Sequence, residues 1–206
     1  MTKGIIFRFA LYTLIIFGFT GSLPFWVGEG DYLVFAENAF IQRLQLALLA
    51  ASAIILVLVA RSSGTPAVCY LLGIVTMIAF NRELDSFWNK IIPFLGWKAI
   101  VTLFVLAGIA VSYYYRHNLN SQIGKFLQDN GRSFGLFWCG FVVAVPFAQL
   151  VGHGDFLMEV LGDDYVPHYK RVIEELGELA GYMLLLVGSL ELIPESNGKT
   201  SSVNEL

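Results

Sequence analysis

Residues 168–192 read HYKRVIEELGELAGYMLLLVGSLEL, which begins with charges of both signs and ends as an almost pure hydrocarbon run. The apolar part, with its flanks, has the length of a membrane-crossing helix. At 100° per residue its polar side chains form one stripe with spacings of three or four. That stripe consists of His168, Arg171, Glu175, Glu178 and Tyr182. The stretch therefore predicts a helix that enters a membrane with carboxylates on one face.

A second stripe of the same helix consists of glycines, namely Gly177, Gly181 and Gly188. Small residues at four-residue spacing let two membrane helices approach closely. If the glycine stripe packs on a neighbour, the acidic stripe turns toward the bundle interior or a water-filled crevice. Facing lipid would be costly for Glu178, which lies one turn deeper than Glu174 and Glu175.

The acidic stripe therefore contains candidate catalytic groups. We expect Glu178 and Glu175 to be these groups, with Arg171 as their counter-charge. The alternative is that Arg171 pairs with Glu175 four residues later and that both acids are simply solvated above the lipid headgroups. That alternative fits Glu174 and Glu175 better than Glu178.

The whole chain has the composition of a membrane protein. Of its 206 residues, 56% are hydrophobic and only 14% are charged, against about 25% charged in soluble domains. The net charge of only -3 gives no indication of nucleic-acid binding, and we expect no nucleic-acid partner. The two cysteines, Cys69 and Cys139, lie in apolar runs and predict no disulfide framework.

Six runs are long and apolar enough to predict membrane spans. Lys3 before the first run also fits a signal peptide, but Arg8 within the run and the lack of a cleavage site favour an uncleaved span. We therefore expect an all-α protein, with one six-helix transmembrane domain over 1–194 and a disordered cytoplasmic tail over 195–206. The predicted spans are about 5–26, 39–60, 66–82, 98–116, 133–152 and 174–193. In the fifth span, Pro146 predicts a kink.

Loop charges give the expected orientation. Placing both termini in the cytoplasm leaves seven of the thirteen Lys and Arg residues inside, a weak positive-inside bias. The acids are far more asymmetric, since twelve of the sixteen fall on the outer side. These twelve are Glu29, Asp31, Glu37, Glu83, Asp85, Asp155, Glu159, Asp163, Asp164, Glu174, Glu175 and Glu178. We expect a multi-pass protein of a bacterial inner membrane with an acidic outer face.

Other polar groups fall at the same predicted depth as the carboxylates of residues 174–178. Glu37 precedes the second span, Asp85 follows the third, and His153 follows the fifth. Together with His168 they are candidate metal ligands, because carboxylates and imidazoles hold zinc, manganese or iron. The alternative is that they are ordinary helix caps and hydrogen-bonded surface groups. Within the second span, Gln42 and Gln45 could bond to a neighbouring helix or belong to the site.

Three segments carry a resemblance. ENAFIQ (37–42), RELD (82–85) and the late helix HYKRVIEELGEL (168–179) resemble an uncharacterised type of small bacterial polytopic inner-membrane protein. This resemblance implies no activity. A looser analogy is to membrane hydrolases of the ceramidase and adiponectin-receptor kind, which imply a histidine-held metal. The chain departs from them because it lacks their paired histidines on one helix.

Three function classes remain open. The first is a metal-dependent membrane enzyme acting on a lipid or membrane-associated substrate, with zinc, manganese or iron as its cofactor. The second is a cation-binding transporter or channel. The third is a non-catalytic assembly or sensor subunit. The lipid bilayer is the expected partner, with a homodimer or a membrane partner protein as the further expectation.

Overall fold

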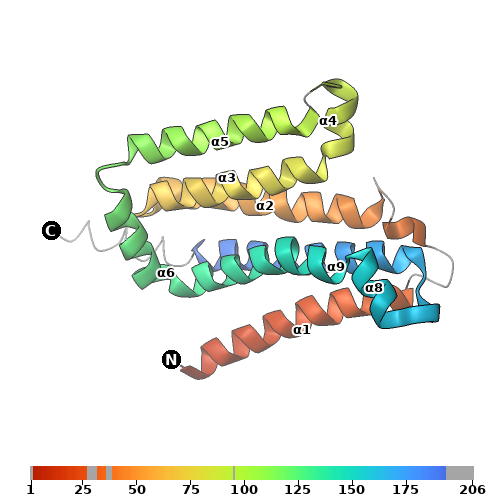
Figure 1. Cartoon of the computed structure of the whole chain (residues 1–206). Coiled ribbons are helices and arrows are strands. Elements are labelled where there is room, and N and C mark those ends of the chain that lie inside the picture. The colour runs from red at the N-terminus through yellow and green to blue at the C-terminus, as the bar shows by residue number, and fades with distance from the viewer. Residues whose placement is uncertain (1, 27–31, 36–38, 95, 194–206) are drawn as a thin grey trace. The chain divides into compact units, whose positions relative to one another are not determined.

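The computed structural model describes residues 2–26, 32–35, 39–94 and 96–193 (Figure 1). The described residues form helices and turns, without a strand. The long helices are α1 (Thr2–Trp26), α2 (Phe40–Ser62), α3 (Pro66–Glu83), α5 (Gly96–Tyr114), α6 (Leu119–Val142) and α9 (Pro167–Glu191). Shorter elements are η1 (Tyr32–Phe35), α4 (Asp85–Ile91), η2 (Val143–Phe147), α7 (Ala148–Val151), α8 (Gly154–Leu161) and η3 (Gly162–Asp164). The expected tail over 195–206 lies outside the described residues.

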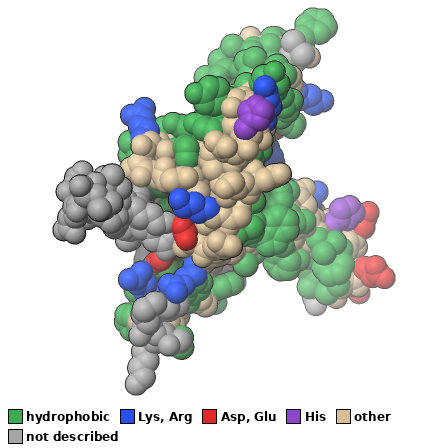
Figure 2. All heavy atoms as spheres, turned by 90° about the vertical axis from the view of Figure 1, so that its left-hand side faces the viewer, with side chains coloured by type: hydrophobic (Ala, Val, Ile, Leu, Met, Phe, Trp, Pro, Cys, Tyr) green, Lys and Arg blue, Asp and Glu red, His purple; other side chains and the backbone are tan. Residues whose placement is uncertain are grey.

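Four of these helical stretches are long and apolar enough to cross a membrane. They are Ile6–Leu23, Phe40–Ser62, Gly96–Tyr114 and the continuous helical stretch Leu119–Val151. A fifth candidate is the pair α3 and α4, if the two count as one broken span. Large apolar side chains such as Phe7, Leu58 and Ile109 are more than half exposed, and apolar side chains cover much of the face seen in Figure 2. A surface of this kind is compatible with contact to lipid.

The chain forms two compact units, each built from segments that are distant in the sequence. Unit 1 comprises residues 1–45 and 138–187, and unit 2 comprises residues 46–137 and 188–206. In unit 2, α3 packs between α2 and α5. A Cβ on Gly73 of α3 would lie 3.7 Å from Leu56 of α2, and one on Gly108 of α5 would lie 3.8 Å from Ile74 of α3.

The RELD segment marks a sharp break between α3 and α4. The two helices are bent by 72° at Leu84. The break is bridged by Asn81, whose Oδ1 accepts a hydrogen bond from Trp88 Nε1 at 3.1 Å and whose Nδ2 donates to the carbonyl of Met77. The third span is expected over 66–82, and the structure has a helix there that ends at Glu83. This helix meets the length and hydropathy of a membrane span only when α4 is counted with it.

The long helical stretch from Leu119 to Val151 departs from regular α-helical geometry at two places. Asn130 leaves the helical conformation, with φ -126° and ψ 28°, so α6 consists of two helical parts. Pro146 lies in the π-helical turn η2, where the N–H of Ala148 reaches back to the carbonyl of Val143. Proline lacks a donor and cannot continue the regular ladder, and a π turn absorbs the mismatch. The irregularity predicted at Pro146 is present in this form.

Candidate polar site on helix α9

Helix α9 of unit 1 is packed through its glycines against α6, η2 and α7. A Cβ built on Gly181 would lie 2.6 Å or less from the backbone oxygen of Gly140 and from atoms of Ala144. One on Gly177 would lie 2.9 Å from the Cβ of Ala148. No larger side chain fits at a backbone contact this close. The glycines therefore fix how α9 is rotated against this neighbour.

The third glycine of the stripe belongs to unit 2 and makes a similar contact there. A Cβ on Gly188 would lie 3.0 Å from the ring of Phe137 and 3.2 Å from the carbonyl oxygen of Ser133. The contacted helix is again α6. The three glycines at 177, 181 and 188 thus face one continuous helical stretch.

On another face, α9 is bonded to the first turns of α2. Gln45 Nε2 donates to the backbone carbonyl of Glu175 at 3.1 Å and to its carboxylate Oε2 at 3.0 Å. Only the nitrogen end of the amide can donate to a carbonyl, so this contact fixes the orientation of the Gln45 side chain. The sequence predicts that Gln45 either joins helices or belongs to the site, and this contact makes it at least a link between helices.

The side-chain oxygen of Gln45 is the unusual atom of this contact. Gln45 is fully buried, with 0% exposure, and its Oε1 has no hydrogen-bond partner among the residues that the structure describes. A buried acceptor without a donor loses the hydrogen bonds it would make to water. This oxygen is therefore a position at which a proton donor, a water or a cation would be favourable.

The predicted carboxylates of α9 occupy different environments. Glu178 is only 6% exposed, while Glu175 and Glu174 are half-buried and Arg171 is exposed. Glu174 does not stand free in solvent, because its Cγ lies where a Cβ of Gly152 would be. Glycine at position 152 thus makes room for Glu174, a role that the sequence alone does not reveal.

The predicted metal ligands are not brought together in the described part of the chain. His153 is exposed, with 63% of its side chain accessible, and its Nδ1 lies 4.0 Å from Asp155 two residues later. Asp85 belongs to unit 2, where its Oδ1 accepts from the N–H of Ser86 in the first turn of α4. Glu37 and the side chain of His168 lie outside the described residues. Among the residues described, no three His, Cys, Asp or Glu side chains could hold a metal ion together.

No protein-family model, no curated protein and no solved structure matches this chain. The resemblance of ENAFIQ, RELD and the late acidic helix to uncharacterised membrane proteins therefore stays a prediction.

The first prediction tests the glycine contact. Gly181→Ala should lower the stability of the detergent-solubilised protein, because the added methyl meets backbone atoms that cannot move aside. Overpacking of this kind costs about 1–3 kcal/mol. Thermal unfolding followed by circular dichroism measures the change.

The matched control is Gly18→Ala in α1, where a Cβ would meet nothing within 4 Å. It should leave the unfolding temperature unchanged or slightly higher, because alanine favours helix over glycine. Equal stability of Gly181→Ala and Gly18→Ala would contradict the close contact between α9 and α6.

Proposed function

We propose that this protein is a six-span bacterial inner-membrane transporter or channel that binds a small hard cation beside Gln45, Glu175 and Glu178. The observation that carries the proposal is the buried, unpartnered oxygen of Gln45 next to the carboxylate of Glu175. Glu178, one turn further along α9, adds a second and more deeply buried carboxylate.

The chemistry of these groups selects the class of ligand. An amide oxygen and carboxylate oxygens are hard donors, which suit protons and alkali or alkaline-earth cations better than soft metals. Ionisable residues within membrane segments mark ion pathways or proton relays by default. A cation would supply the partner that Gln45 Oε1 lacks among the described residues.

The same site favours transport over the metalloenzyme that the sequence also suggests. A transition-metal site would be built on imidazoles, and His153 is exposed beside Asp155, its neighbour along the chain. In contrast, Gln45 on α2 and Glu178 on α9 are buried, and Gln45 is hydrogen-bonded to the half-buried Glu175 of α9. Zinc, manganese or iron analysis of the purified protein is the direct test of the enzyme alternative.

In this proposal α9 is the sixth span, and both termini are cytoplasmic. Support comes from the length of α9, 25 residues, and from the burial of Leu179 and Tyr182 in its middle. Helix α9 contains four glutamates, which is more charge than a typical membrane span carries. We expect this of a helix that lines a polar site. Arg61, Arg116 and Arg132 would then lie at the cytoplasmic side, in line with the positive-inside rule.

The second prediction tests this orientation. An alkaline phosphatase fused to the C-terminus should be inactive in a bacterial host, because this reporter works only outside the cytoplasm. A fluorescent protein fused at the same position should be bright. High phosphatase activity with a dark fluorescent fusion would show an external C-terminus and an odd number of spans.

The third prediction tests the cation site. Proteoliposomes containing indicators for H⁺, Na⁺ or Mg²⁺ should dissipate a gradient of at least one of these ions. Glu178→Gln should reduce the rate to that of empty vesicles, since it removes the buried charge but keeps the shape. Glu174→Gln is the matched control and should retain transport, because the Glu174 side chain packs over Gly152.

Two outcomes would overturn the proposal. One is wild-type vesicles that move none of the three ions while the purified protein holds stoichiometric zinc, manganese or iron. The other is equal transport by Glu178→Gln and wild type. The first would favour the membrane enzyme, and the second would make Glu178 a structural group.

A further inference from the structure

The helical stretch Leu119–Val151 is longer than one membrane crossing requires. It has 33 residues, which is about 50 Å of helix, whereas the hydrocarbon core of a bilayer is about 30 Å thick. Asn130 divides the stretch, because this residue leaves the helical conformation. The part after the break, residues 131–151, has about the 20 residues that a span needs. Residues 119–129 are therefore not needed for the crossing.

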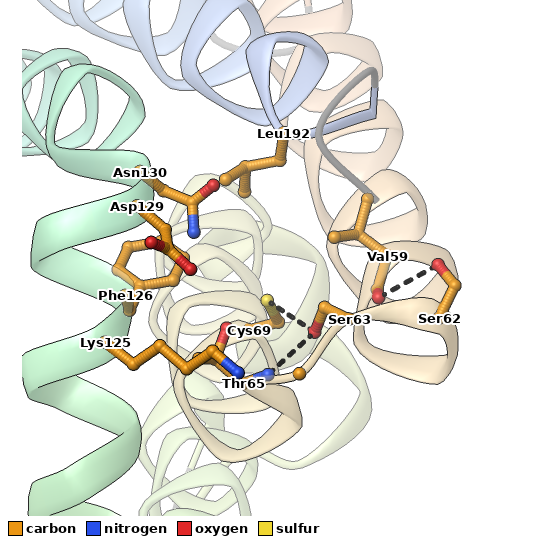
Figure 3. Close-up of a pocket in the computed structure, with 11 residues that line it drawn as sticks. Val59, Ser62, Ser63, Thr65, Cys69, Lys125, Phe126, Asp129, Asn130 and Leu192 are labelled. Carbon is orange, nitrogen blue, oxygen red and sulfur yellow. Dashed lines mark hydrogen bonds between the residues drawn. The ribbon is translucent and has the colours of Figure 1, made fainter. Parts of the chain in front are cut away.

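This first part of α6 also runs in its own direction. Figure 1 shows it turned away from the direction of α2, α3 and α5, across the end of unit 2 where α2 passes into α3. One side is fixed to that connection, since the backbone N–H of Ala67 donates to Gln122 Oε1 at 2.9 Å. Phe126, only 1% exposed, packs beside Thr65 on the same side (Figure 3). A helix that runs across the ends of membrane spans lies along the membrane surface.

The other two sides of this helix differ in polarity. Helical periodicity places Ile123 and Leu127 together, on a strip beside the packed side, where they are 40% and 43% exposed. Ser121 and Gln128 lie on the side away from the packed one and are exposed as well. An exposed apolar strip next to a polar face is the pattern of a helix that lies in the membrane interface.

Side chains typical of the membrane interface lie at the same end of unit 2. Helix α5 ends with Tyr113 and Tyr114, which are 68% and 78% exposed, and α6 begins five residues after Tyr114. The guanidinium carbon of Arg116 lies 4.2 Å from the centre of the Tyr113 ring. Tyrosines gather where spans meet the headgroup layer. The end of α5 thus places the start of α6 at the level of the lipid headgroups.

This end of unit 2 carries more cations than carboxylates. Among the described residues at this end, the cations are Arg61, Arg116, Lys125 and Arg132, and the carboxylates are Asp129 and Glu191. Four positive and two negative charges leave a net charge of +2. A basic amphipathic helix of this kind is attracted to the negative surface potential of a membrane that contains anionic lipids.

We propose that residues 119–129 form an amphipathic helix in the plane of the membrane that binds an anionic lipid surface. Ile123 and Leu127 insert between the upper parts of the acyl chains, while Lys125 and Arg132, both exposed, lie beside the lipid phosphates. The interaction belongs to unit 2 and does not depend on the cation site proposed in unit 1.

The fourth prediction concerns the depth of this helix. Leu127→Cys and Gln128→Cys would each be made in a Cys139→Ser background, since Cys139 is exposed and Cys69 is buried. The full chain would be labelled with a small fluorophore and placed in nanodiscs of phosphatidylglycerol and phosphatidylcholine. The Leu127 label should be quenched by a nitroxide near the top of the acyl chain and protected from aqueous iodide. The Gln128 label is the matched control and should show the reverse.

Two results would overturn the in-plane helix. Equal quenching of both labels by iodide would place residues 119–129 in water. Stronger quenching of the Leu127 label by a nitroxide at the end of the acyl chain than by one near its top would make these residues part of a span.

Native mass spectrometry of the protein released from the same nanodiscs tests the charge of the lipid surface. Lys125→Gln and Arg132→Gln should each lower the preference for phosphatidylglycerol over phosphatidylcholine about five-fold, the size expected for one cation near an anionic surface. Lys90→Gln is the control, because Lys90 is exposed and lies in α4, beyond the other end of α3. It should keep the wild-type preference, and all three variants should keep the wild-type unfolding temperature. An unchanged preference in both Lys125→Gln and Arg132→Gln would overturn the anionic lipid surface as the partner.

Discussion

The hydrogen bonds from Gln45 to Glu175 are the contact on which the candidate site depends. They join the first turns of α2 to α9 by way of both a carbonyl and a carboxylate. In a lipid environment such polar contacts are among the few forces that distinguish one helix pairing from another. Because they hold the nitrogen end of the amide, they also fix the place of Oε1, which is buried without a partner in the described part of the chain. The same interaction thus links α9 to α2 and orients the oxygen on which the proposed cation site rests.

The glycines of α9 complete this arrangement from the other side. Gly177 and Gly181 let α9 approach Ala148, Ala144 and Gly140 at backbone distance. Because the glycine face of α9 packs against α6 and α7, the face that carries Glu175 lies against Gln45. Lipid tails give no hydrophobic drive for helix association, so close packing and hydrogen bonds together determine the rotation of α9.

The sequence could predict the parts of this account that depend on periodicity. Helix class, the two stripes of α9 and the irregularity at Pro146 follow from spacing and from the missing donor of proline. Contacts between distant segments could not be predicted, because no spacing connects Gln45 with Glu175 or Gly152 with Glu174. Glu37 and the side chain of His168 lie outside the described residues, so their predicted roles stay predictions.

A double-mutant cycle between Gln45 and Glu175 tests the central claim most directly. Gln45→Leu, Glu175→Leu and the double variant would be compared with wild type by unfolding in detergent. We expect the two changes to be coupled by about 0.6–1.7 kcal/mol, the average and the largest value that double-mutant cycles give for hydrogen bonds between membrane helices. The coupling should grow when the bound cation is present, because it needs both oxygens. Strictly additive effects would mean that the side chains of Gln45 and Glu175 do not interact, and the site proposed on α9 would lose its basis.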